Sequence, residues 1–175
     1  AIAKTQLTVY TAVEAEDLKK YAATFNEDHP DIEINWVRDS TGIVTAKLLA
    51  EKENPQADIV WGLAATSLML LKEEGMLEAY SPKGIDALDP KFKDSDSPAT
   101  WTGMDAWVAA VCFNTVEGAK NGLPMPNSWI DLTDPVYKGH ISMPNPASSG
   151  TGFLVVSSWL QLFGEDGGAT SLRPR

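Results

Sequence analysis

The sequence has few of the residues from which most catalytic and metal sites are built. It contains one cysteine, Cys112, and two histidines, His29 and His140, which lie beside turn residues and far apart in the chain. One cysteine excludes a disulfide within the chain and a CxxC metal motif. We therefore expect no metal site and no cofactor. Because Cys112 lies in the apolar run 108–113, we expect a buried thiol.

Enzyme signatures are also missing from the sequence. No GxSxG, HExxH or GxxxxGK[ST] motif occurs. Ser148 or Ser149 would need a base to act as a nucleophile, and nothing in the sequence marks one. We therefore expect that the protein is not an enzyme. A small Ser-dependent hydrolase for acyl or phosphoryl transfer is the alternative from a different class.

Long apolar runs are absent, and charge of one sign is in excess. No stretch approaches the roughly 20 apolar residues that span a bilayer, and no signal peptide precedes the first strand-like segment. We expect a mature N-terminus from which a signal peptide has been removed, and hence a periplasmic location. The formal net charge of -10 excludes nucleic acid and anionic membranes as partners, because both would be repelled. A site for a small anion must therefore depend on local hydrogen-bond donors.

What the sequence does contain is a regular alternation of strand and helix patterns. Apolar residues with a period of about two or about 3.6 follow one another through the first 75 residues, and Pro or Gly ends most of the helical patterns. The order strand-helix-strand-helix-strand-helix predicts a mainly parallel sheet with right-handed crossovers. The expected strands are 6–10, 32–37 and 57–61, and the expected helices are 14–28, 40–53 and 65–74.

The rest of the chain is less regular. Residues 80–103 are rich in Ser, Pro, Asp and Lys, and we expect a long surface segment there. Residues 104–113 look like a single strand that is long by usual standards. Such a strand would connect a first α/β lobe, residues 1–106, to a second lobe, residues 107–175. Within the second lobe we expect a strand over 141–143 and a helix over 149–163.

Candidate binding residues follow the expected strands. Tyr10 and Thr11 end the first strand, residues 39–42 (Asp-Ser-Thr-Gly) follow the second, and residues 63–66 follow the third. Ligands of open α/β sheets bind outside the carboxyl ends of the strands, where the free N–H groups of helix N-termini attract anions. These segments therefore predict an anion site, although Ser and Thr are also common as simple helix caps.

A second candidate segment is the run 145–152, Asn-Pro-Ala-Ser-Ser-Gly-Thr-Gly, which leads into an apolar helix. Glycine lets the backbone approach a ligand closely, and Ser and Thr add short uncharged donors. Phosphate, phosphonate or carboxylate would suit this segment, and a Ser N-cap on a tight turn is the alternative. Asp105, at the start of the long strand, would pair with a ligand ammonium group or else remain a solvated carboxylate.

Several of these segments together resemble a known family. They are similar to the periplasmic binding proteins of the ferric-iron and 2-aminoethylphosphonate group, and most similar to the members that bind 2-aminoethylphosphonate. The likeness covers about residues 5–167. The segments that carry it are residues 9–11, 39–42, 57–62, 111–114 and 145–152.

The resemblance implies a type II periplasmic binding fold with two α/β lobes, and delivery of a phosphonate to an ABC transporter permease. One group of residues would line the first lobe's side of the cleft: Tyr10, Thr11, Ser40, Thr41, Ala64 and Thr66. Another group would hold the phosphonate oxygens from the second lobe: Ser148, Ser149, Gly150 and Thr151. Asp105 or Glu14 is our own assignment for the ligand amine. A ferric-ion or other oxyanion-binding protein of the same fold is the alternative.

The resemblance also implies that the second lobe is incomplete and the chain truncated. Residues 169–175 depart from the family, and we interpret them as the product of a one-nucleotide frameshift. An incomplete lobe would leave a sheet edge and apolar helix faces exposed, so we expect self-association. A remnant that binds nothing is a further alternative.

Overall fold

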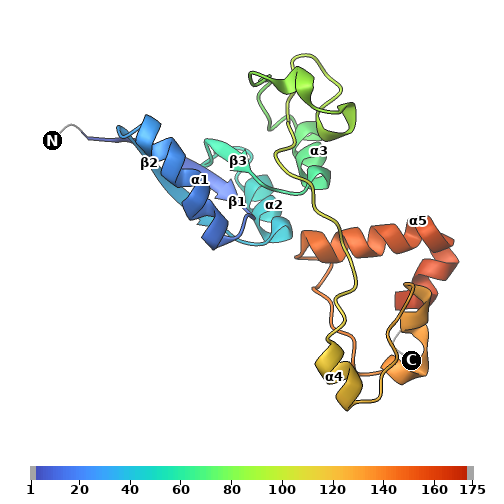
Figure 1. Cartoon of the computed structure of the whole chain (residues 1–175). Coiled ribbons are helices and arrows are strands. Elements are labelled where there is room, and N and C mark those ends of the chain that lie inside the picture. The colour runs from blue at the N-terminus through green and yellow to red at the C-terminus, as the bar shows by residue number, and fades with distance from the viewer. Residues whose placement is uncertain (1–2, 173–175) are drawn as a thin grey trace. The chain divides into compact units, whose positions relative to one another are not determined.

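The computed structural model describes residues 3–172, and the chain divides into two compact units, Ala1–Ala106 and Trp107–Arg175. Figure 1 shows the elements of both units in chain order. Each unit is described by itself below.

The first unit is built on a parallel sheet of three strands. β1 (Thr5–Thr11) lies between β2 (Ile32–Arg38) and β3 (Ile59–Trp61). The ladder places Thr11 opposite Arg38 on one side and opposite Trp61 on the other. Three helices connect or follow the strands: α1 (Ala15–Asp28), α2 (Thr41–Ala50) and α3 (Ala65–Glu73). The expected α/β fold with a parallel sheet is confirmed for this unit.

Successive residues of β1 point to opposite faces of the sheet, and each face has its own helices. Tyr10 belongs to a buried cluster with side chains of α2 and α3 and of the loop between β3 and α3: Val44, Leu48, Leu63 and Leu71. On the other face, Tyr21 of α1 packs edge-on against Trp61, with ring centroids 5.2 Å apart. This layering brings the N-termini of α2 and α3 to the carboxyl ends of the strands.

The segment after α3 was expected to be a long surface segment, but it contains short helices and is held to α3 by hydrogen bonds. It contains two short 3₁₀ helices, Ile85–Ala87 and Pro90–Phe92. Asp94 is buried and accepts hydrogen bonds from Lys72 Nζ at 2.6 Å and from the Thr100 hydroxyl at 2.6 Å and N–H at 2.9 Å. One carboxylate thus ties this segment to α3.

The second unit contains helices but no strand between residues 107 and 172. Its elements are α4 (Thr115–Lys120), two 3₁₀ helices (Ile130–Thr133 and Pro135–Tyr137) and α5 (Gly150–Leu172), which breaks at Gly164 with φ 69°. The predictions of a strand over 104–113 and another over 141–143 are wrong. A strand needs a hydrogen-bonded neighbour, and neither segment belongs to a sheet.

The prediction of a buried Cys112 is also wrong. The thiol is exposed and lines a cavity of about 380 Å³ together with Trp129, Tyr137 and Trp159. Because no neighbouring strand covers residues 108–113, the apolar character of this run does not lead to burial.

Candidate functional site

The carboxyl ends of the three strands bring one group of the predicted site residues together. Thr11 ends β1, Ser40 and Thr41 begin α2, and Ala64 and Thr66 begin α3. The Asp39 N–H donates to the Thr11 carbonyl at 3.2 Å, which joins the loop before α2 to the end of β1. Residues that lie far apart in the sequence therefore share one end of the sheet.

The N-termini of α2 and α3, at this end of the sheet, have no side-chain cap. Ser40 occupies the N-cap of α2 but makes no capping hydrogen bond, and Ala64, at the N-cap of α3, has no side chain that could make one. The Ser40 hydroxyl lies 3.5 Å from the Asp39 carboxylate, at the limit of a hydrogen bond. By contrast, Asn114 caps α4 by accepting from the N–H groups of Val116 and Glu117. The first N–H groups of α2 and α3 thus remain available as donors for an anion.

The side chains of Tyr10 and Thr11 point into the unit instead. Tyr10 is 2% exposed, and its hydroxyl donates to Glu51, which follows the far end of α2, at 2.9 Å. Burial raises the pKa of Tyr10, and the hydrogen bond to Glu51 raises it further. Thr11 is fully buried, and its hydroxyl accepts from the Val13 N–H at 3.1 Å. These two residues shape the end of the sheet without exposing their hydroxyls there.

Asp105 lies beside the same end of the sheet. Its neighbour Met104 has Sδ 3.7 Å from the point where a Cβ on Gly62 would stand, and Val13 Cγ2 is 2.1 Å from that point. The β1–α1 loop, the β3–α3 loop and residue 104 therefore converge. Asp105 is exposed, so its carboxylate is accessible beside this convergence.

Arg38 is a residue that the sequence analysis did not assign to the site. Its Nε donates to the Val13 carbonyl at 2.7 Å, and an Nη donates to the Glu14 carboxylate at 2.5 Å. It is the last residue of β2, so its guanidinium brings a positive charge to the carboxyl end of the sheet. The position of an Arg immediately before the Asp-Ser-Thr-Gly run was the available signal.

The remaining predicted residues form a second group, in the second unit. Ser148, Ser149, Gly150 and Thr151 surround the start of α5. The N–H groups of Ser148 and Ser149 donate to the Asn145 carbonyl at 3.2 and 2.8 Å, and the Ser149 hydroxyl accepts from the Gly152 N–H at 3.3 Å. The segment is thus a tight turn that leads into a helix, with the Thr151 side chain exposed.

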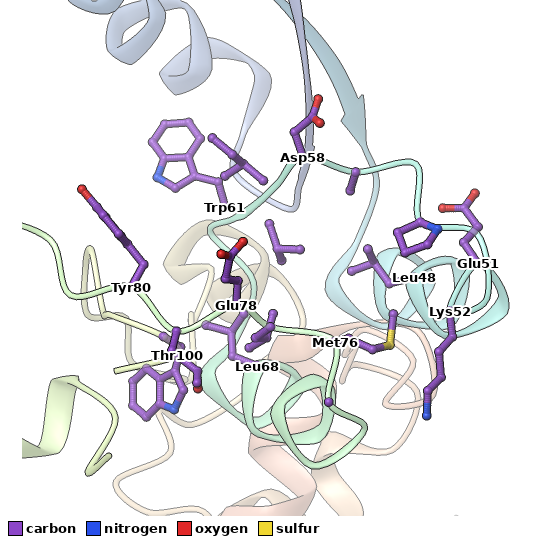
Figure 2. A pocket seen from close by; sticks show the side chains of 18 of the residues that line it. Leu48, Glu51, Lys52, Asp58, Trp61, Leu68, Met76, Glu78, Tyr80 and Thr100 are labelled. Carbon is purple, nitrogen blue, oxygen red and sulfur yellow. The ribbon is translucent and has the colours of Figure 1, made fainter. Parts of the chain in front are cut away.

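A separate cavity lies along the outer side of β3. It has a volume of about 910 Å³ and is lined by residues of β3, of the end of α2 and of the segments 75–82 and 100–102. In Figure 2 the side chains of Trp61, Glu78, Tyr80 and Asp58 border it. None of the predicted binding residues lines this cavity. The cavity therefore lies along the unpaired edge of the sheet, at β3, and not at the end of the sheet where the helices begin.

The described residues contain no cluster of three or more His, Cys, Asp or Glu side chains suited to a metal ion. Within residues 3–172, no helix has the length and apolar character needed to cross a membrane.

Comparison with known proteins agrees with this architecture. A protein of Sinorhizobium fredii described as a probable ABC transporter periplasmic-binding protein, y4fP, is 29% identical over 135 residues, which are 77% of this chain and 37% of that protein. An uncharacterized protein of Haemophilus influenzae is 32% identical over 168 residues, which are 94% of this chain and 48% of that protein.

A solved structure is also similar. The periplasmic binding protein AfuA from Actinobacillus pleuropneumoniae, with exogenous fructose-6-phosphate bound, has a TM-score of 0.83 and 34% identity. The alignment covers 98% of this chain and 55% of that one. The aligned parts make up 37% to 55% of these proteins, so the chain spans about half of their length or less.

A family model provides the assignment. The model described as "Bacterial extracellular solute-binding protein" matches residues 54–174, and so extends beyond residue 167, where the resemblance in the sequence was expected to end. The matched residues cover the second half of the first unit and nearly all of the second unit. The parallel α/β fold of the first unit agrees with this match. The chain belongs to the family of bacterial extracellular solute-binding proteins.

Proposed function

We propose that the chain provides the ligand-binding surfaces of an ABC importer's solute-binding protein for 2-aminoethylphosphonate or a similar phosphonate. The observation that carries the proposal is Ser40, which stands at the N-cap of α2 and yet does not cap it. A hydroxyl and the first N–H groups of the helix are thus left to a ligand. The similar proteins y4fP and AfuA are described as periplasmic binding proteins, so the site is proposed to bind and release a ligand without chemical change.

The electrostatics of the chain explain why donors of this kind are needed. With a net charge of -10, the overall field opposes an incoming anion. A helix N-terminus offsets this locally by about 0.3–1 kcal/mol when exposed and by up to about 2 when partly buried. The N-termini of α2 and α3 meet at one end of the sheet, and their contributions to an anion there would add.

Units 1 and 2 would correspond to the first lobe and to part of the second lobe of such a protein. In the second unit, the hydroxyls of Ser148–Thr151 and the N–H groups of Gly150 and Thr151, which begin α5, would supply further donors to the phosphonate oxygens. Asp105 or Glu14 is the carboxylate proposed for the ligand amine. As members of this family act with a membrane permease, the partner in transport would be an ABC permease.

A sugar phosphate is the second candidate ligand, because the similar protein AfuA was solved with fructose-6-phosphate bound. Its phosphate group presents the same tetrahedral oxygens to helix N-termini as a phosphonate does. A ferric ion is the third candidate. Its usual protein ligands are anionic oxygens, whereas the predicted residues offer mostly neutral donors.

Isothermal calorimetry on the chain tests the proposal. We expect heat from 2-aminoethylphosphonate with a Kd below about 10 μM, which corresponds to about 7 kcal/mol, and little heat from inorganic phosphate. Binding of fructose-6-phosphate alone would select the second candidate, and colour with ferric iron the third. Turnover of a generic ester or phosphate would instead support a hydrolase.

We also propose that the chain associates with a second copy of itself along β3. The other edge strand, β2, contains the charged residues Glu33 and Arg38, whereas Ile59–Trp61 contains none. Ile59 is 43% exposed and borders cavities on both faces of the sheet. Charged residues protect sheet edges from pairing with another chain, so β3 is the edge suited to pairing.

A further inference from the structure

The loop between β1 and α1 is held on two sides by residues outside it. Arg38 Nε donates to the Val13 carbonyl at 2.7 Å, and Gly62 leaves just enough room for the Val13 side chain, since a Cβ there would stand 2.1 Å from Cγ2. Gly62 has φ 68°, a region that favours glycine. The position of Val13, and of Glu14 after it, is thus set by the neighbouring strands.

Glu14 is placed by the same guanidinium. Its Oε2 accepts from an Arg38 Nη, and although Glu14 stands at the N-cap of α1, its side chain makes no capping hydrogen bond. The other oxygen, Oε1, accepts no hydrogen bond from any residue between 3 and 164. One oxygen therefore fixes the carboxylate, and the second remains open.

The guanidinium of Arg38 also has donors that are left without a hydrogen-bond partner among the described residues. Two of the five guanidinium N–H groups make the contacts to Val13 and Glu14, and the remaining N–H groups have no partner within the described chain. The side chain of Arg38 is 36% exposed and that of Glu14 is 76% exposed. The pair therefore presents a positive and a negative group side by side, next to the N-terminus of α2.

We infer that Arg38 is a positioning residue of the ligand site, and that the Arg38–Glu14 pair selects zwitterions that carry an ammonium group beside their anionic head. This inference rests on the proposed function and deepens it. Glu14 Oε1 accepts from the ammonium group, while Arg38 holds the carboxylate and the β1–α1 loop in place. The anionic head is bound by the helix N-termini. An ordinary surface ion pair would contribute little and would not distinguish ligands.

The test compares 2-aminoethylphosphonate with ethylphosphonate, which lacks the amine. For Glu14→Gln we expect a loss of about 10- to 100-fold in affinity for 2-aminoethylphosphonate, as for a lost hydrogen bond to a charged group, and an unchanged affinity for ethylphosphonate. Glu74→Gln is the matched control: Glu74 is also an exposed carboxylate paired with a cation, Lys52 at 2.8 Å. It should alter neither affinity by more than about twofold.

A second variant tests the positioning role. Arg38→Lys keeps the charge but cannot hold Val13 and Glu14 through one planar group. We expect this variant to weaken the binding of 2-aminoethylphosphonate more than the binding of ethylphosphonate. We also expect it to accelerate amide hydrogen exchange in the β1–α1 loop. Circular dichroism of each variant verifies that the fold is intact.

Other outcomes would overturn the inference. Equal losses for both ligands in Glu14→Gln would show a structural role only, and a selective loss in Asp105→Asn in place of Glu14→Gln would assign the amine to Asp105. In both cases the proposed phosphonate function would stand. If the unaltered chain bound neither phosphonate, the proposed function itself would fail, and this inference with it.

Discussion

Val13 packs so closely against Gly62 that a Cβ on the glycine would stand 2.1 Å from Val13 Cγ2. We therefore predict that Gly62→Ala destabilises the first unit. The positive φ of 68° costs an alanine about 1–2 kcal/mol, and the displaced Val13 adds to this. Urea unfolding should show a lower midpoint, and the displaced loop should weaken ligand binding.

Gly75 provides the control for this prediction. It has the same φ of 68°, but a Cβ there would meet no atom within 4 Å. Gly75→Ala should therefore show the conformational cost alone and leave ligand binding unchanged. If the two variants were equally stable and bound ligand equally well, the contact between Val13 and Gly62 would have no importance.

The hydrogen-bond network of Asp94 leads to a second prediction. We expect Asp94→Asn to lower the free energy of unfolding by about 2–4 kcal/mol, because the side chain is 3% exposed and its charge faces Lys72 and the Thr100 N–H. Asp96→Asn is the control. Asp96 also contacts Lys72, at 2.8 Å, but is 59% exposed, so its loss should cost less than about 1 kcal/mol.

The same network predicts how stability depends on pH. Burial by itself would raise the pKa of Asp94, but the hydrogen bonds from Lys72, Thr100 and the Asp96 N–H outweigh it and hold the pKa well below its usual range. A carboxyl group with a lowered pKa stabilises the fold above its unfolded pKa of about 3.9 and loses that contribution as the pH falls further. Unfolding measured from pH 7 down to about pH 2 should therefore show a steeper loss for the unaltered chain than for Asp94→Asn.

The regular first part of the fold could be predicted because its signals are local. The apolar periods and the Pro and Gly breaks gave the order of the elements, and this order alone places Ser40 and Ala64 at one end of a parallel sheet. The direction of the Tyr10 side chain could not be predicted. It depends on which face of β1 is covered by α2, and a shift of one residue would reverse it.

Other features depend on residues that are distant in the sequence. The run 108–113 has a strand's composition, but it has no neighbouring strand in the described chain, so Cys112 is exposed. Asp94 lies in a segment with weak periodicity, and its importance comes from Lys72 and Thr100. Arg38 acquires its role from two residues of another loop. In each case the burial or the contacts of the residue depend on residues that are distant in the sequence, and not on the local sequence pattern.

Ser40 gives a fourth prediction, which separates binding from stability. Ser40→Ala should weaken phosphonate binding by about 10- to 100-fold, as for the loss of a donor to a charged group. It should change the free energy of unfolding by less than about 0.5 kcal/mol, since the hydroxyl caps nothing. Calorimetry and urea unfolding of the same samples provide both values.

Asn114→Ala is the converse control for Ser40. Asn114 caps α4 through two hydrogen bonds, at 3.1 and 3.0 Å, so its loss should cost about 0.5–2 kcal/mol without affecting binding. A stability loss in Ser40→Ala with unchanged binding would mean that Ser40 acts only as a cap.

The fifth prediction concerns self-association through β3. Ile59 pairs with Val9 in the register, and the Thr11 carbonyl bonds to the β2 side through the Asp39 N–H. Because bonding groups alternate along a strand, Ile59 faces β1 and the N–H of Val60 points away from it. Val60→Pro removes this outward donor without removing a bond of the β1–β3 ladder. We expect the variant to sediment as a monomer at concentrations where the unaltered chain forms dimers.

The matched control for Val60 lies on the opposite edge of the sheet. The Asp39 N–H donates to Thr11, so by the same alternation the N–H of Ile34 points outward from β2, and Ile34→Pro should leave association unchanged. Because each copy carries a net charge of -10, screening by salt should strengthen the association. A monomer at every concentration and salt level would exclude the dimer, and equal losses in both variants would show that β3 is not the specific contact. If association weakened as salt was added, attraction between charges and not strand pairing would hold the copies together.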